Sequence, residues 1–141
     1  MGKMVAAEVI CLLLQLLVIG FLSADEECNF ARASQFEGND KKIFFNIPMY
    51  CSAGKISWHY PQGFLYIKLF IPNDHFTICL FKRNGLIDFP VYDYSSGTRR
   101  KLNTSVQHVC TRSVDGLIEV HVEAHAHIVY MTTFNYTVNA A

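Results

Sequence analysis

Short runs rich in β-branched and aromatic residues follow one another along most of the sequence, and turn-forming residues separate them. No long stretch shows helical periodicity. In the run FLYIKLFI, one strand face would carry Leu65, Ile67, Leu69 and Ile71, and the other Phe64, Tyr66, Lys68 and Phe70. Similar runs lie at residues 76–82, 117–124 and 132–138. At least six strands at this spacing, without helices, predict an all-β antiparallel β-sandwich.

Turn chemistry divides these runs at four places. Pro72-Asn73-Asp74 separates the first two runs, and Asn84-Gly85 is the dipeptide typical of a tight β-hairpin. Ser95-Ser96-Gly97 begins a polar loop, and Asp115-Gly116 turns the chain into the run at 117–124. No repeat, linker or low-complexity tract follows residue 24, so we expect one domain over residues 25–141.

The N-terminal segment has the order of a secretory signal peptide. Lys3 supplies a basic start, residues 9–22 are apolar except for Gln15, and the small residues Ser23 and Ala24 precede three acidic residues. A transmembrane helix needs about 20 apolar residues, and this run is shorter. We therefore expect a signal peptide over residues 1–24, with cleavage after Ala24 or close to it, and a secreted, extracellular protein of about 117 residues.

The charge balance bears on the class of partner. Twelve basic and 12 acidic residues give a formal net charge of zero. This composition does not indicate a nucleic-acid partner, because binding to phosphates depends on a basic surface. No later apolar run is long enough to cross a bilayer, so we expect no membrane insertion once the signal peptide is removed.

Cysteines and glycosylation sequons fit the same exported setting. Cys11 lies in the predicted signal peptide, and the other four cysteines are Cys28, Cys51, Cys79 and Cys110. An even number in a small secreted chain predicts two disulfides, with three possible pairings. No two of them have the Cys-x-x-Cys spacing of a metal site. Sequons begin at Asn103 and Asn135, and we expect both asparagines to carry glycans.

The stretch CSAGKISWHYPQGFLYIKL, from Cys51, is the most informative part of the sequence. Gly54, Ile56 and Ser57 followed by Tyr60-Pro61 resemble a CUB-type pattern. More closely, the stretch resembles the N-terminal domain of the meteorin family, in Cys51, Ala53, Gly54, Trp58, Tyr60, Pro61 and Gly63. The order of the other cysteines and a final strand with Phe134 and Tyr136 fit the same family.

This resemblance implies a CUB-like jelly-roll sandwich with the disulfides Cys28–Cys51 and Cys79–Cys110. It also implies a secreted signalling or neurotrophic-type factor that acts through protein contacts. Meteorins carry a second, netrin-like domain, which is absent from this sequence. Calcium-binding CUB domains place an acidic residue soon after the third cysteine, whereas Leu80, Phe81, Lys82 and Arg83 follow Cys79. We therefore expect no calcium site of that type, and no cofactor.

Sequence patterns of catalytic sites are absent. The sequence contains no Gly-x-Ser-x-Gly, no His-Glu-x-x-His and no phosphate-binding loop. Scattered Ser, His and Asp residues can still meet in space. We expect a binding protein and not an enzyme.

Basic residues gather in and near one loop. They are Lys82, Arg83, Arg99, Arg100 and Lys101. Such a cluster could bind a polyanion such as a glycosaminoglycan, or an acidic receptor surface, and a dibasic pair could be a processing site. A solvated loop on a neutral protein explains the same residues, and we favour this interpretation because the run is short.

The sequence EVHVEAHAH, residues 119–127, allows three interpretations. In a strand, Ile118, Val120, Val122 and Ala124 would face the core, and Glu119, His121, Glu123, His125 and His127 would lie on the solvated face. His125 and His127 could instead bind zinc or copper, with His121 or Glu123 as a third ligand. Carboxylates beside imidazoles would also suit a pH-responsive surface. We favour the solvated face.

Two functions of different class follow from these observations. The first is a secreted glycoprotein that binds an extracellular protein or a cell-surface receptor through an exposed surface of the sandwich. The second is a metal- or pH-responsive extracellular binding module that uses the strand from His121 to His127.

Overall fold

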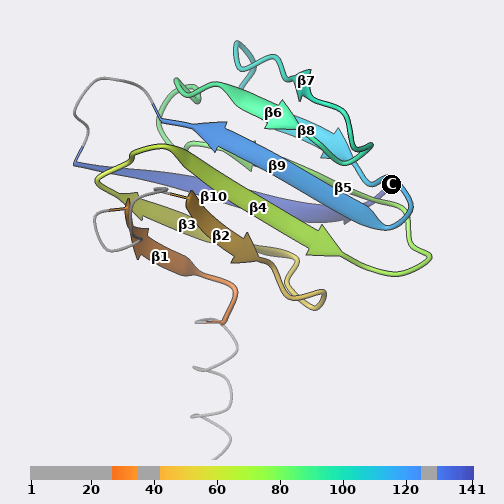
Figure 1. Ribbon diagram of the computed structural model, residues 1–141. Coiled ribbons are helices and arrows are strands. Elements are labelled where there is room, and N and C mark those ends of the chain that lie inside the picture. The colour runs from red at the N-terminus through yellow and green to blue at the C-terminus, as the bar shows by residue number, and fades with distance from the viewer. Residues whose placement is uncertain (1–26, 35–41, 125–129) are drawn as a thin grey trace, which may run out of the picture.

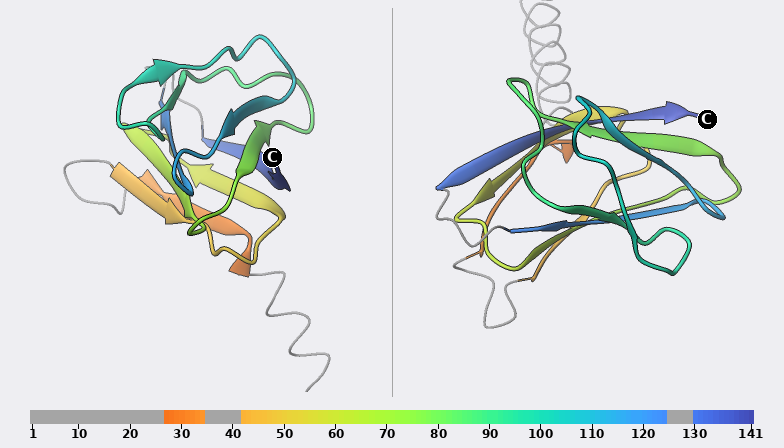
Figure 2. Two further views of the ribbon diagram at one scale, coloured as in Figure 1. Left: turned by 90° about the vertical axis from the view of Figure 1, so that its right-hand side faces the viewer. Right: turned by 90° about the horizontal axis from the view of Figure 1, so that it is seen from above.

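The computed structural model describes residues 27–34, 42–124 and 130–141. Within these ranges, ten strands form two five-stranded sheets that pack face to face (Figure 1). Sheet A has the strand order β1-β3-β10-β5-β8, and sheet B has the order β2-β4-β9-β6-β7. The strands are β1 Phe30–Ala33, β2 Lys42–Asn46, β3 Ala53–His59, β4 Phe64–Phe70, β5 Phe76–Phe81, β6 Val91–Asp93, β7 Arg100–Lys101, β8 Val109–Arg112, β9 Leu117–Glu123 and β10 Met131–Ala140. Figure 2 shows the two layers from above.

Antiparallel pairing dominates both sheets. It joins β3, β10, β5 and β8 in sheet A, and β4, β9, β6 and β7 in sheet B. The edge strands β1 and β2 differ, because they pair in parallel with β3 and β4. The all-β sandwich that the sequence predicts is confirmed, with these two parallel edges as a detail that alternation alone does not indicate.

The core lies between the sheets and follows the predicted alternation. In β4, Leu65, Ile67 and Leu69 are buried, and Lys68 and Phe70 are exposed. In β9, Ile118, Val120 and Val122 are buried as predicted, and Ala124 packs partly against the same core. Trp58, Phe134 and Tyr136 are the largest fully buried side chains. Removing this apolar area from water supplies most of the stabilisation of a sandwich.

The two disulfides have the pairing that the resemblance implies. Cys28 bonds to Cys51, so the segment before β1 is tied to the segment before β3. Cys79 of β5 bonds to Cys110 of β8, which lies directly opposite it in the sheet. In the chain-entropy model each such bond contributes about 3 to 4 kcal/mol by restricting the unfolded chain. Both bonds fit an exported protein.

Two residues that carry the resemblance have structural roles. A Cβ on Gly54 would lie 1.9 Å from the Cys28 carbonyl oxygen, so only glycine allows this close approach. The Tyr136 hydroxyl passes over the same glycine and donates to that carbonyl at 2.7 Å. Trp58 is fully buried, and its Nε1 donates to the Ser34 hydroxyl at 2.7 Å. A buried Trp N–H needs such a partner.

One of the predicted turns is wrong. Asn84-Gly85 does not form a tight hairpin, because β5 belongs to sheet A and the next strand, β6, belongs to sheet B. The connection between the sheets buries Ile87 and Phe89 in the core, and this tertiary packing overrides the local turn preference. The turn at Asp115-Gly116 is confirmed, and both residues have positive φ, as a tight hairpin turn requires.

The predicted signal peptide, residues 1–24, lies outside the described residues and stays a prediction, as does the domain boundary at residue 25. In the part of the chain that the structure describes, no helix is long and apolar enough to span a membrane.

Candidate functional site: the aromatic outer face of sheet B

Each sheet has one face in the core and one outer face, and the two outer faces differ in chemistry. On sheet A, the outward positions of β3 and β10 carry mainly small or polar side chains, which are Ala53, Lys55, Ser57, Thr133, Asn135 and Thr137. The outward positions of sheet B carry several aromatic rings. The aromatic face is the unusual one, since outward positions of a solvated sheet are normally polar.

Four ring-bearing side chains form a row across sheet B, one from each of four neighbouring strands. We call Phe44, Tyr66, His121 and Tyr92 the aromatic row. The Phe44 and Tyr66 rings stack with their centroids 4.7 Å apart. The Tyr66 and His121 rings meet edge to face at 4.2 Å. Such ring pairs contribute about 0.5 to 1.5 kcal/mol each beyond the area they bury, so the rings of the row hold one another in place. The row is exposed at its Phe44 end, whereas His121 and Tyr92 are buried.

His121 lies at the centre of the row and is almost fully covered. The Tyr94 ring stacks on it at 3.9 Å, from the turn that follows β6. Its Nε2 lies 2.9 Å from Glu119 Oε1. The face predicted for His121 is correct, but the expectation of a solvated side chain is wrong, because only 9% of the residue is exposed. Rings from β4 and from the turn after β6 cover it, and neither lies next to it in the sequence.

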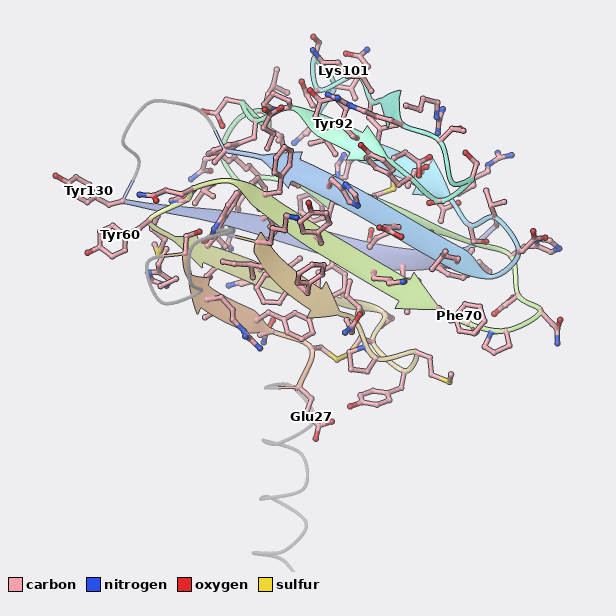
Figure 3. The ribbon with its side chains drawn as sticks, in the orientation of Figure 1. Glu27, Tyr60, Phe70, Tyr92, Lys101 and Tyr130 are labelled. Carbon is pink, nitrogen blue, oxygen red and sulfur yellow. A yellow bond between two sulfur atoms is a disulfide. The ribbon has the colours of Figure 1, made fainter. Side chains whose placement is uncertain are left out.

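Tyr92 closes the row at the β6 end. Its hydroxyl donates to Glu123 Oε2 at 3.1 Å. The Arg99 guanidinium lies over its ring, 3.8 Å from the centroid, which is a cation–π contact. Lys101 lies opposite Tyr92 in the pairing of β6 with β7, and Figure 3 shows both at the same edge of the molecule. This end of the row is therefore basic on its outer side.

A buried polar network holds this edge in place. Asp93 Oδ2 accepts hydrogen bonds from Arg100 Nη2 at 2.8 Å and from the Thr111 hydroxyl at 2.6 Å. Its Oδ1 accepts one from the Ser95 backbone amide at 2.9 Å. Burial alone would raise the pKa of Asp93, but the hydrogen bonds from Arg100, Ser95 and Thr111 outweigh it and lower the pKa below its usual value. Because Thr111 belongs to sheet A, the network fixes the β6–β7 hairpin against the other sheet.

The β2 and β4 end of the face is open to solvent. Phe44 is 60% exposed and Phe70 is 53% exposed. Figure 3 shows Phe70 at the far end of β4 from Tyr60. Lys42 and Lys68 lie on the same face as Phe44, in the neighbouring cross-strand positions. Exposed aromatic rings beside charged groups are typical of surfaces that contact another molecule.

Most of the predicted basic cluster is committed to contacts within the protein. Lys82 Nζ lies 2.7 Å from Asp88 Oδ1, Arg100 binds Asp93, and Arg99 covers Tyr92. Arg83 and Lys101 are exposed. Binding of a polyanion by these residues stays a prediction, and so does processing at the dibasic pair.

The predicted metal ligands are only partly described. His125 and His127 lie outside the described residues. His121 contacts Glu119, and Glu123 accepts a hydrogen bond from Tyr92. In the described ranges, no three His, Cys, Asp or Glu side chains are grouped so that they could hold a metal ion. The metal hypothesis therefore stays a prediction that depends on the histidines beyond Ala124.

Both sequon asparagines lie outside the core. Asn103 is exposed, and its Oδ1 accepts a hydrogen bond from the Ser105 amide at 2.9 Å. Asn135 lies on the outer face of sheet A, between Lys55 of β3 and Phe81 of β5. Their glycosylation stays a prediction.

Sequence reasoning missed the aromatic row as a unit. The outward placement of Phe64, Tyr66 and Phe70 was visible in the alternation of their run. The alignment of Phe44 with Tyr66 was not visible, because it depends on the register between β2 and β4. An excess of aromatic residues at predicted outward positions is the signal that could have located this face.

Comparisons with known proteins give fold likeness only. No family model matches the sequence, and no curated protein matches it either. Among solved structures, the pre-peptidase C-terminal domain of collagenase from Bacillus anthracis is 9% identical, with a TM-score of 0.48 over 72% of this chain and 97% of that chain. The CUB1-EGF-CUB2 domains of rat MASP-1 are 12% identical, with a TM-score of 0.44 over 71% of this chain and 42% of that chain. PliG from Salmonella Typhimurium, a periplasmic inhibitor of g-type lysozyme, is 9% identical, with a TM-score of 0.42 over 70% of this chain and 98% of that chain.

Proposed function

We propose that this protein is a secreted, disulfide-bonded glycoprotein that binds an extracellular protein or a cell-surface receptor through the exposed Phe44 end of the aromatic row on sheet B. The observation that carries the proposal is the register of Phe44, Tyr66, His121 and Tyr92 across four strands. The meteorin resemblance supports a signalling role for that binding. The two disulfides support an extracellular setting.

The row suits binding because it is ordered before a partner arrives. The Tyr94 ring holds His121, and Arg99 and Glu123 hold Tyr92. Side chains that are already fixed lose little conformational freedom on binding. Aromatic residues combine a large apolar area with few rotatable bonds, and they dominate the binding energy of many protein interfaces.

The charges around the row indicate the kind of partner. Lys42 and Lys68 lie near the Phe44 end, and Glu119 and Glu123 lie on β9. A partner would therefore place apolar side chains on the exposed Phe44 and Phe70 rings, and charges of both signs around them. Such mixed charge favours a protein surface over a uniformly anionic polymer.

The proposal can be tested with a panel of receptor ectodomains and the glycosylated protein from animal cells. We expect at least one ectodomain to bind, and a Phe44→Ala, Phe70→Ala double variant to bind it at least tenfold more weakly. Truncating an interface aromatic often costs more than about 1.4 kcal/mol, which corresponds to a factor of ten.

A matched control separates this effect from a general loss of surface area. Leu86 is 48% exposed and lies in the connection between β5 and β6. Leu86→Ala should bind like the natural sequence. Equal binding by the double variant, or selective binding to a glycan array in place of the ectodomains, would contradict the proposal.

A metal- or pH-responsive module is the second candidate. The contact between His121 Nε2 and Glu119 Oε1 at 2.9 Å favours it, because it places an imidazole against a carboxylate on the same strand. Calorimetric titration with zinc and with copper tests the metal form. We expect no binding tighter than about 1 μM, roughly −8 kcal/mol. Tighter binding that is lost in a His125→Ala, His127→Ala variant would place this function first.

A further inference from the structure

Asn135 has an unusual neighbour for a glycosylation sequon. It lies in the interior of β10, which is the central strand of sheet A, and the pairing places it directly opposite Phe81 of β5. Thr137, the third residue of the sequon, lies two positions further along the same strand and so on the same face. Phe81 is a half-buried ring on a face whose other outward positions on β3 and β10 are mainly small or polar.

These side chains line a shallow groove of about 400 Å³ on the outer face of sheet A. Asn135 and Thr137 lie along it, with Phe81 on one side and Lys55 on the other. The His108 ring lies 4.7 Å from the Phe81 ring and supports it from the β8 side. The ring is therefore held in position beside the asparagine.

We propose that the first sugar of an N-linked glycan on Asn135 packs on the Phe81 ring in this groove and stabilises the folded protein. The inference rests on the export that the proposed function includes. In the transfer, Asn135 Nδ2 forms a bond to the anomeric carbon of a lipid-linked oligosaccharide. The bond from that carbon to the lipid diphosphate breaks, and the amide loses one proton.

The geometry allows the contact at short range. Side chains directly opposite each other in an antiparallel pair have their Cβ atoms about 4.5 to 5.5 Å apart. A sugar ring attached to Asn135 Nδ2 begins one bond beyond the side chain, so it spans this distance without straining the strand. The C–H groups on one face of an N-acetylglucosamine ring are apolar, and covering the solvent-accessible part of the Phe81 ring with them removes apolar area from water.

The inferred glycan would also give the two outer faces different roles. It would cover sheet A around Asn135 and leave the exposed Phe44 end of the aromatic row on sheet B open. The groove would then be a site for the protein's own sugar and not for a separate ligand.

A thermal unfolding cycle tests the contact in an Asn103→Gln background, so that only Asn135 can carry a glycan. The protein is secreted from cells that make high-mannose glycans and is then trimmed with an endoglycosidase that leaves one N-acetylglucosamine. We expect this form to unfold about 3 to 6 °C higher than the Asn135→Gln variant, the shift that about 1 kcal/mol produces in a domain of this size. When both proteins also carry Phe81→Leu, the unfolding temperatures of the trimmed glycoform and the Asn135→Gln variant should differ by less than about 1 °C.

A second measurement covers the case in which Phe81→Leu does not fold. In the trimmed protein with Phe81 intact, proton NMR should show sugar resonances shifted upfield by the aromatic ring. Several outcomes would overturn the inference: an unmodified Asn135 by mass spectrometry, sugar protons at their free-solution shifts, or the same stabilisation with and without Phe81. Ectodomain binding through sheet B, measured on the same samples, would be unaffected by any of these, so the two proposals can fail separately.

Discussion

Replacing Gly54 with alanine places a methyl group where the chain has no room for one. The new Cβ would lie 1.9 Å from the Cys28 carbonyl oxygen, and 2.7 and 2.8 Å from two atoms of the Tyr136 side chain. An ordinary contact is about 3.4 Å or longer, so the carbonyl would have to move by more than 1 Å. It cannot move easily, because Cys28 is bonded to Cys51 and β1 is paired with β3.

The expected cost follows from this geometry. Overpacking a well-filled core costs about 1 to 3 kcal/mol when side chains can adjust. Here the obstacle is a backbone carbonyl, so we expect Gly54→Ala to lose about 3 to 5 kcal/mol of the free energy of unfolding. This is a large part of the 5 to 15 kcal/mol that roughly describes a domain's stability.

Urea denaturation, followed by tryptophan fluorescence, measures this loss directly. Trp58 is the single tryptophan and is fully buried, so its emission reports unfolding of the core. Gly97→Ala is the matched control, because Gly97 has φ of 85° but no atom within 4 Å of its Cβ position. It should lose only the backbone strain of about 1 to 2 kcal/mol. A loss for Gly54→Ala no larger than that for Gly97→Ala would refute the close approach of Cys28, Gly54 and Tyr136.

Two further predictions concern ionisable groups. The pKa of Asp93 is lowered in the folded protein, so its contribution to stability is present above the unfolded pKa of about 3.9 and is lost as the pH falls through the folded value. Asp93→Asn should therefore lower the free energy of unfolding by about 1 to 3 kcal/mol at neutral pH. In chemical denaturation, the stability of the variant should also decline less steeply than that of the natural sequence as the pH falls. Burial raises the pKa of Tyr136 to about 12, so stability should fall as the pH rises from about 10 toward that value. Tyr136→Phe should lower the free energy of unfolding by about 1 kcal/mol at neutral pH, because the hydrogen bond to the Cys28 carbonyl is lost. The variant should also lose less stability than the natural sequence as the pH rises above about 10. An unchanged loss would contradict the assignment of this alkaline effect to Tyr136.

Much of the fold was predictable because it depends on local patterns. Alternation placed Leu65, Ile67 and Leu69 in the core, and the same pattern placed Ile118 and Val120 there. Disulfide pairing was not determined by these patterns. It followed from the resemblance, and the structure confirms it.

The two wrong predictions, of the turn at Asn84-Gly85 and of a solvated His121, have one physical origin. It is packing between segments that are distant in the sequence. Asn84-Gly85 prefers a tight turn, but burial of Ile87 and Phe89 draws the chain across to the other sheet. His121 lies at an outward position, yet Tyr66 and Tyr94 cover it. The residues that cover His121 lie outside the stretch 119–127, so that stretch alone does not indicate its burial.

The candidate site was predictable only in part for the same reason. Outward aromatic residues could be counted from the sequence, but their alignment into a row depends on the register of four strands. A shift of one residue in β2 would turn Phe44 to the core side and bring Phe45 to the surface.

Photo-crosslinking on living cells tests the binding face most directly. A benzoylphenylalanine introduced in place of Phe44 samples the exposed end of the aromatic row, and one in place of Thr133 samples the outer face of sheet A. The secreted protein carrying each probe is added to cells and irradiated, with and without an excess of the unmodified protein. We predict that the probe at residue 44 forms a crosslink to a cell-surface protein that the excess abolishes, and that the probe at residue 133 does not. A competed crosslink from residue 133 alone, or none from residue 44 on cells that bind the protein, would contradict the assignment of the aromatic row as its binding surface.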